Sequence, residues 1–108
     1  MKIFKFGGAS VKSADGVRNL STIVRSEHDK LFVIVSAMGK TTNALERLLE
    51  SFYTACKDEA LSELKDVIGY HNDICKELWG TGHTPERTAR FYEELRTIVS
   101  EGNPQYGT

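Results

Sequence analysis

The sequence has no long hydrophobic run, and neither sign of charge is in excess. Its longest uninterrupted apolar run, Leu31–Val35, is far shorter than the roughly 20 residues that a membrane-spanning helix needs. The first residues also lack the pattern of a secretory signal peptide, so we expect a cytoplasmic protein. Lys and Arg number 14 against 15 Asp and Glu, a formal net charge of −1. This balance gives no reason to expect a nucleic-acid or membrane partner.

Cysteine is also scarce, since Cys56 and Cys75 are the only two. In a chain without an export signal, we expect them to be reduced thiols rather than a disulfide. A zinc site could in principle combine them with His71 and His83, but the closely spaced ligand pairs of structural zinc sites are absent. We therefore predict that no residue of this chain binds a metal directly.

The first stretch of the chain carries the strongest functional signal. A short apolar strand runs into Gly7 and Gly8, and Ser10 precedes the start of a helix. A strand, a glycine turn and a helix start together can form a cradle for an anion. Lys5 interrupts the strand near its carboxyl end, where burying an ammonium group is costly unless an anion such as phosphate lies opposite it. The alternative is a plain strand-to-helix turn, with the lysine extending into water.

A second strand follows after one helix. Ser13 offers a cap for that helix, and Leu31–Val35 reads as a strand buried on both faces. The two strands and the helix together span about 30 residues, the size of one βαβ unit, so the strands should be parallel. Their carboxyl ends then share one edge of an α/β sheet, where ligands bind. The glycine turn and the polar loop at residues 36–43 should therefore meet there.

The remainder of the chain is expected to be helical. One helix is predicted through Leu61–Leu78 and should end at Gly80. Another should open at Thr84–Glu86, where a capping residue precedes a proline, and should end near Gly102. The predicted class is thus α/β, with a parallel βαβ core followed by helices.

Two motifs resemble the aspartate kinase family. KFGGASV at Lys5–Val11 is similar to the family's KFGGTSV, and VSAMGKTTN at Val35–Asn43 resembles its second signature loop. The resemblance covers the whole chain and matches the N-terminal part of an amino-acid kinase domain. It implies a three-layer α/β/α fold, in which residues 1–56 form a βαβα core with both ligand loops and residues 57–108 form a helical segment.

The resemblance also implies a reaction. The family transfers the γ-phosphoryl group of ATP, with Mg²⁺, to the side-chain carboxylate of L-aspartate, the first step towards lysine, threonine and methionine. Carried over by position, Lys5 would be catalytic and Ser36 and Thr42 would hold the aspartate. The residues implied at ATP are Lys5, Phe6, Gly7, Gly8 and Ser10.

One position departs from the family pattern, because Ala9 stands where the family usually has threonine. Backbone N–H groups would then have to replace any hydroxyl contact with the phosphates. The family's kinase domain is also much longer than this sequence, so the chain reads as a fragment that is inactive alone. The parent protein is expected to be a homo-oligomer.

Two other functions remain open. Gly39–Thr41 after an apolar strand imitates the end of a P-loop, although Ile34 stands where that motif requires its first glycine. Alternatively, the helices at residues 58–101 could be a non-catalytic interaction module.

Overall fold

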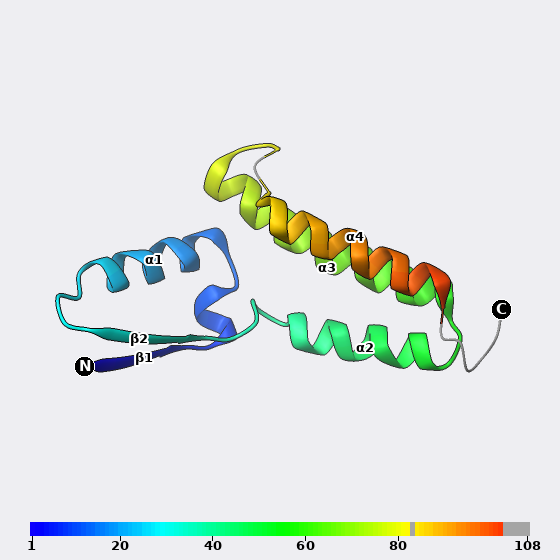
Figure 1. The fold of residues 1–108 in the computed structure, drawn as a ribbon, viewed down its shortest axis with the longest axis horizontal. Coiled ribbons are helices and arrows are strands. Elements are labelled where there is room, and N and C mark those ends of the chain that lie inside the picture. Colours follow the sequence, from blue (N-terminus) through cyan, green and yellow to red (C-terminus); the bar gives the residue numbers. More distant parts are fainter. Residues whose placement is uncertain (83, 103–108) are drawn as a thin grey trace. The chain divides into compact units, whose positions relative to one another are not determined.

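The computed structural model describes residues 1–82 and 84–102 and has two compact units, Met1–Thr41 and the chain from Thr42 onward (Figure 1). The elements in chain order are β1 (Lys2–Phe6), the 3₁₀ turn η1 (Gly8–Val11), α1 (Ala14–Arg25), β2 (Leu31–Val35), α2 (Thr41–Tyr53), α3 (Lys57–Trp79) and α4 (Glu86–Glu101). The predicted α/β class is confirmed. None of the described helices is long and apolar enough to cross a membrane. The assignment of the whole chain to one amino-acid kinase domain stays a prediction.

The first unit is a βαβ arrangement. Strands β1 and β2 pair in parallel, with Lys2 opposite Leu31 and Phe6 opposite Val35. The parallel pairing and the bounds of β2 were both predicted from the sequence. Helix α1 lies along one side of the two strands (Figure 1). Its first turn is capped as expected, because the Ser13 hydroxyl accepts a hydrogen bond from the Gly16 N–H at 3.2 Å.

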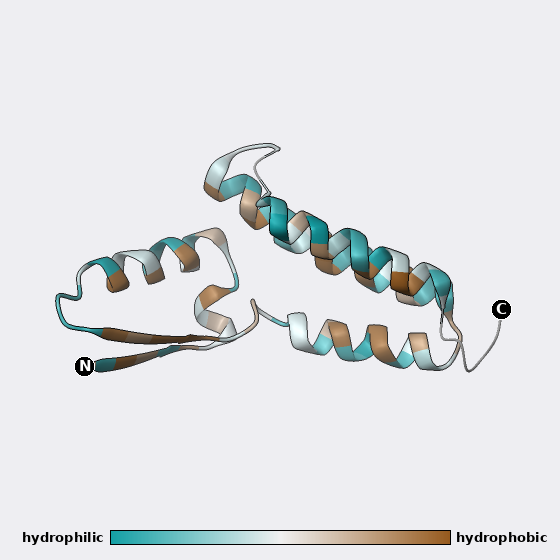
Figure 2. Ribbon diagram, in the orientation of Figure 1, coloured by the Kyte–Doolittle hydropathy of each residue, from teal (hydrophilic) through white to brown (hydrophobic). Residues whose placement is uncertain are grey.

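The expectation that the strands are buried on both faces is wrong for the described residues. Ile3, Phe32 and Ile34 share the sheet face opposite Phe4 and Phe6, and they are 64%, 56% and 44% exposed. Figure 2 shows the hydrophobic character of both strands. In the first unit, α1 lies on one face of this sheet, so that unit by itself supplies two layers of the predicted three.

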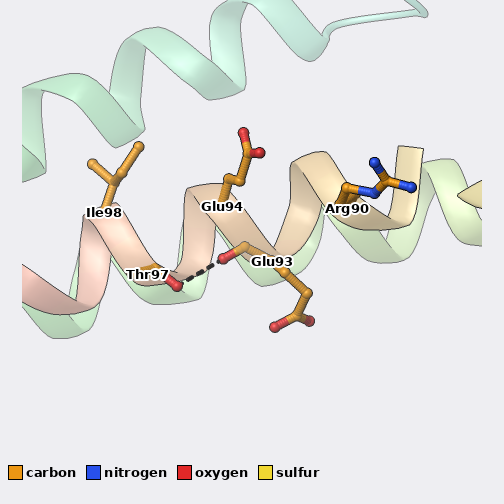
Figure 3. Close-up of a pocket in the computed structure, with 5 residues that line it drawn as sticks. All are labelled: Arg90, Glu93, Glu94, Thr97 and Ile98. Carbon is orange, nitrogen blue, oxygen red and sulfur yellow. Dashed lines mark hydrogen bonds between the residues drawn. The ribbon is translucent and has the colours of Figure 1, made fainter. Parts of the chain in front are cut away.

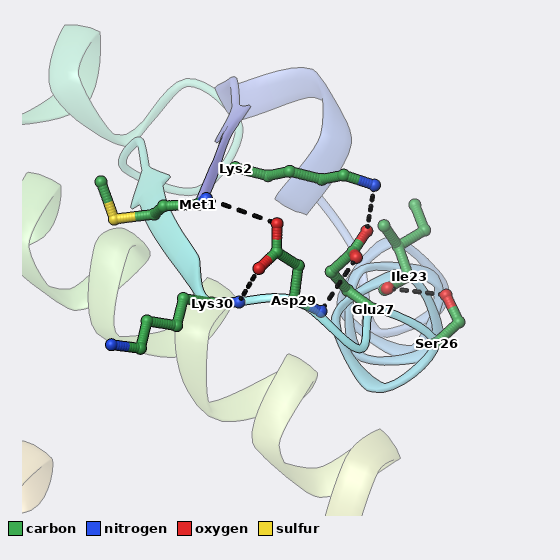
Figure 4. A network of polar contacts seen from close by, with 7 residues as sticks. All are labelled: Met1, Lys2, Ile23, Ser26, Glu27, Asp29 and Lys30. Carbon is green, nitrogen blue, oxygen red and sulfur yellow. Dashed lines mark hydrogen bonds and ion pairs between the residues drawn. The ribbon is translucent and has the colours of Figure 1, made fainter.

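Charged groups tie the amino ends of the two strands together (Figure 4). The amino group of Met1 lies 3.3 Å from Asp29, and Lys2 donates to Glu27 at 3.1 Å. The Lys2 hydrogen bond is the main reason that the pKa of the Glu27 carboxyl is lowered. Asp29 also accepts from the Lys30 N–H at 2.8 Å, which fixes the entry into β2. This network lies at the end of the sheet opposite the candidate ligand loops.

The second unit contains α2 and an antiparallel pair, α3 and α4. Its core consists of apolar residues of α3 and α4, with Leu48 of α2 packed against them. Its buried members are Ala60, Leu64, Ile68 and Val99. Gly80 and Gly102 end α3 and α4 as predicted, with φ angles of 92° and 78° that favour glycine.

Two local predictions about helix starts need correction. Thr84 does not cap α4, because its hydroxyl donates to the Asn72 side chain at 3.0 Å and so ties the connection to α3. Helix α2 begins at Thr41, so the loop expected at residues 36–43 is shorter, covering residues 36–40. His83, considered above as a metal ligand, lies outside the described residues.

Candidate ligand site at the carboxyl end of the sheet

The loops that follow β1 and β2 contact each other directly. The Ser36 N–H donates to the Phe6 carbonyl at 2.9 Å, and the Gly39 N–H donates to the Gly8 carbonyl at 3.0 Å. Parallel strands bring their carboxyl ends to one edge, and here the two loops meet at that edge as predicted. Both of these hydrogen bonds join backbone atoms. The geometry of the meeting therefore depends on how closely the two main chains approach.

The paired glycines have different surroundings. A Cβ atom on Gly8 would lie 2.7 Å from the Gly39 carbonyl oxygen and 3.1 Å from that of Ala37, so a side chain there would force the backbone of the second loop to shift. Gly7 has φ −77° and ψ 173°, which any residue can adopt, and a Cβ atom there would meet no atom within 4 Å. Gly8 is therefore required for loop packing. At Gly7 there is open space beside the loop. Such space allows a ligand to approach the backbone closely.

Lys5 is exposed, which contradicts the argument that a buried ammonium group demands an anion. Its side chain belongs to the uncovered face of the sheet and has Ile34 as its strand neighbour. Water can solvate the ammonium group there, so burial alone does not point to a ligand. No hydrogen bond or ion pair joins Lys5 to another described residue. The charge is thus available to a ligand at the end of the strand.

The charged residues within the two loop segments are all lysines. Residues 5–13 and 36–42 contain three lysines and no aspartate or glutamate. The lysines are Lys5, Lys12 and Lys40. The first carboxylate after the turn, Asp15, pairs with Arg18 at 2.9 Å. Loop segments with lysines and no carboxylate suit a polyanion better than a free cation.

Backbone donors lie in the same turn. The Ser10 N–H donates to the Gly7 carbonyl at 3.0 Å and closes η1, whereas the N–H groups of Gly8 and Ala9 make no hydrogen bond with the described residues. Ala9 and Ser10 are exposed. Phe6, by contrast, is buried and its carbonyl already accepts the Ser36 N–H, so its implied contact with ATP stays a prediction. Ala9 stands where the aspartate kinase family usually has threonine. Without that hydroxyl, the Ala9 N–H is the group that could contact a phosphate at this position.

The two residues implied for aspartate lie on different elements. Ser36 directly follows β2 and is exposed. Thr42 is exposed too, but it lies in the first turn of α2 rather than in the loop. Thr42 is also the first residue of the second unit, whereas Ser36 belongs to the first. Their joint role at aspartate stays a prediction.

Thr41 is a structural residue of this site that sequence reasoning missed. It is buried, and its hydroxyl donates to the Met38 carbonyl at 2.6 Å, where its N–H also donates at 3.1 Å. These bonds close the loop immediately before α2. A hydroxyl residue at a helix start is a recognised signal, which could have identified this position.

The other predicted chemistries have less support from the geometry. Among residues 1–82 and 84–102, no group of three or more His, Cys, Asp or Glu could hold a metal ion. Cys56 and Cys75 are both free thiols. The P-loop alternative also has little support, because Ile34 lies inside β2 and the loop before α2 contains only residues 36–40.

A surface pocket of about 470 Å³ lies on α4, away from these loops in the sequence (Figure 3). Its lining residues are Arg90, Glu93, Glu94, Thr97 and Ile98. The Thr97 hydroxyl donates to the Glu93 carbonyl within the helix at 3.0 Å. With two carboxylates against one guanidinium group, this pocket is a poor match for a phosphate ligand.

No family model matches the chain, and no solved structure matches it. Two similar curated proteins are plant aspartokinases. Aspartokinase 2, chloroplastic, of Arabidopsis thaliana is 38% identical over 79 residues, which is 70% of this chain and 14% of that protein. The bifunctional aspartokinase/homoserine dehydrogenase 1, chloroplastic, of Zea mays is 28% identical over 99 residues, 91% of this chain and 10% of that protein.

The chain thus spans a small part of the length of the relatives it matches. Its similarity is to an aspartokinase-related region, which supports a kinase-related family as the coarse assignment. Both relatives are several times longer than this chain. The activity of the chain itself is therefore a matter for proposal.

Proposed function

We propose that this chain supplies the ATP-phosphate cradle and part of the aspartate site of an aspartokinase. The observation that carries the proposal is the joined loop pair at the carboxyl end of the sheet, which has three lysines, no carboxylate and open space at Gly7. The similarity to plant aspartokinases supports the choice of reaction.

Each group has a proposed role in transferring the γ-phosphoryl group of ATP to the aspartate side chain. The Lys5 ammonium group stabilises charge on the transferring phosphoryl, and the free N–H groups of Gly8 and Ala9 bind phosphate oxygens. The Ser10 hydroxyl lies beside them. Ser36 and Thr42 hold the aspartate, whose carboxylate accepts hydrogen bonds from their hydroxyl groups.

The loop residues fit the phosphates of ATP better than they fit Mg²⁺. Mg²⁺ prefers oxygen ligands, chiefly carboxylates and phosphates, and residues 5–13 and 36–42 have no carboxylate side chain. Mg²⁺ would accordingly be held through the phosphates of ATP. When bound, it would neutralise charge between the phosphates.

The test is a titration of the ¹⁵N-labelled chain with ATP, followed by backbone amide signals. We expect the signals of Gly7, Gly8 and Ala9 to shift, with inorganic tripolyphosphate acting similarly and adenosine having little effect. Lys5→Ala should weaken binding by about tenfold, the loss expected for a charge-assisted contact.

Lys30→Ala is the matched control, because Lys30 is an exposed lysine at the opposite end of the sheet. It should bind ATP as the unaltered chain does. Equal losses in the two variants would indicate general electrostatic attraction instead of a cradle. Shifts confined to α4 would place the nucleotide elsewhere and contradict the proposal.

A further inference from the structure

Gly16, which none of the motifs contains, lies directly behind the candidate cradle. It is the third residue of α1, and a Cβ atom there would lie 2.4 Å from the Ser10 carbonyl oxygen and 3.2 Å from the Ser10 carbonyl carbon. Both atoms belong to the backbone of η1. A side chain at this position could not be accommodated by rotating a flexible neighbour.

The surrounding residues leave neither element free to move aside. Val11 and Ala14, on either side of the connection between η1 and α1, are only 2% and 1% exposed. The Gly16 N–H is held by the Ser13 hydroxyl, and the Val17 N–H donates to the Ser13 carbonyl at 3.1 Å. The start of α1 is therefore fixed against the turn that contains Ser10.

The cradle is held from its other side as well. Gly8 approaches the second loop so closely that a Cβ atom would lie 2.7 Å from the Gly39 carbonyl oxygen. The turn is thus confined between two backbone contacts, one through Gly8 and the other through Gly16. Small displacements of a turn change the directions of its N–H and hydroxyl groups, on which anion binding depends.

We propose that Gly16 is a positioning residue for the phosphate cradle: it lets α1 rest on Ser10 and so sets the direction of the η1 donors. This inference rests on the proposed function, because it concerns the same ligand. Gly16 contacts no ligand itself. Its effect on binding acts through Ser10.

The test compares Gly16→Ala with Gly69→Ala in the full 108-residue chain. Gly69 is the matched control, because it is also a helical glycine but a Cβ atom there would meet nothing within 4 Å. Alanine ordinarily stabilises a helix relative to glycine, so Gly69→Ala should unfold at the same or a higher temperature and bind ATP normally.

Gly16→Ala should weaken ATP binding by about tenfold or more while the chain remains folded by circular dichroism. The ligand-free amide signals of Ser10 and its neighbours should also move. ATP binding equal to that of the unaltered chain would overturn the inference. A loss of thermal stability with unchanged affinity would show a structural role alone and would overturn it too.

A second measurement covers the case in which Gly16→Ala does not fold. In the unaltered chain, ATP should slow hydrogen exchange at the N–H groups of Gly16 and Val17, but not at Ser26, whose N–H donates to the Thr22 carbonyl at the far end of α1. Unchanged exchange at Gly16 and Val17 with ATP bound would contradict the inference. If neither the unaltered chain nor Gly69→Ala binds ATP, the proposed function itself fails.

Discussion

Gly7 and Gly8 are neighbours in the sequence but serve different purposes in the structure. Gly7 has an ordinary extended conformation and open space where a side chain would lie. Gly8 packs its Cα against the backbone of the second loop. We therefore assign Gly7 to ligand binding and Gly8 to the packing of the two loops.

We predict that Gly7→Ala preserves stability but weakens ATP binding. The backbone at Gly7 suits alanine, and removing a glycine restricts the unfolded chain, which stabilises by about 0.4–1 kcal/mol. The new methyl group would occupy the space left for a phosphate. Thermal unfolding and calorimetric ATP titration measure the two effects separately.

Gly8→Ala provides the contrast. It should destabilise the chain by about 1–3 kcal/mol, because the methyl group would overlap the Gly39 carbonyl and force the loops apart. Unaltered stability in Gly8→Ala, or unaltered ATP affinity in Gly7→Ala, would refute the division of roles between the two glycines.

Thr41 and Thr42 form a similar pair, and replacing each with valine should separate structure from binding. Thr41→Val should lower stability by about 1–3 kcal/mol, because it removes the hydrogen bond to the Met38 carbonyl at a buried position. Thr42→Val changes an exposed residue and should stay within about 0.5 kcal/mol of the unaltered chain. Chemical denaturation measures both values.

The same pair tests the aspartate assignment. In the presence of ATP, aspartate should shift the amide signals near Ser36 in the unaltered chain and do so much less in Thr42→Val. A Thr42→Val chain that responds normally to aspartate would remove Thr42 from the proposed substrate site.

At the scale of elements, the packing of α3 against α4 contains one unfavourable group. The Tyr92 hydroxyl is buried and has no hydrogen-bond partner among the described residues. An unpartnered buried hydroxyl loses its hydrogen bonds to water without replacement. Burial, followed by the neighbouring Cys75, accordingly raises the pKa of the Tyr92 phenol.

We predict that Tyr92→Phe stabilises the helical unit by about 1 kcal/mol, because it keeps the ring in the core and removes the unpartnered hydroxyl. Tyr53→Phe is the control, since Tyr53 is exposed and its hydroxyl can reach water. Urea unfolding monitored by circular dichroism compares the two. A Tyr92→Phe chain less stable than Tyr53→Phe would show that the hydroxyl has a favourable partner.

The raised pKa of Tyr92 also has a consequence at alkaline pH. The folded chain retains the phenol proton to a higher pH than the unfolded chain does, so folding is favoured fully only below the unfolded pKa of about 10. Stability should fall as the pH rises from there through the folded pKa. The Tyr92→Phe chain should not show the part of this alkaline loss of stability that the Tyr92 phenol causes.

At the scale of the whole molecule, the proposed site has donors and cations but few of the other groups that phosphoryl transfer requires. Catalysis also needs the nucleotide base held, Mg²⁺ coordinated and the aspartate carboxylate aligned. The loop residues provide no carboxylate, and the described residues form no metal-binding cluster. Binding and turnover should therefore be separable in this chain.

We predict that the 108-residue chain binds ATP weakly but shows no aspartate-dependent ADP release. A coupled ADP assay at millimolar ATP, run with and without aspartate, measures this. Lys5→Ala is the control for any background signal. Aspartate-dependent release that disappears in Lys5→Ala would show that the chain holds a complete active site.

The sequence by itself determined the local framework of this protein. The uninterrupted apolar run at Leu31–Val35 predicted the bounds of β2, the serine at position 13 marked the start of α1, and Gly80 and Gly102 marked the ends of α3 and α4. The short span of the βαβ unit was enough to predict parallel strands and the meeting of their loops. These features depend on residues close together in the chain, so local patterns reveal them.

The tertiary structure alone decided the surroundings of each residue. It showed that Lys5 is exposed, that Gly8 is packed while Gly7 is free, and that Thr41 is the buried member of its pair. It also showed the contact between Gly16 and Ser10, which no motif marks. These properties depend on distances between separate segments, and a one-dimensional pattern of residue types does not contain such distances.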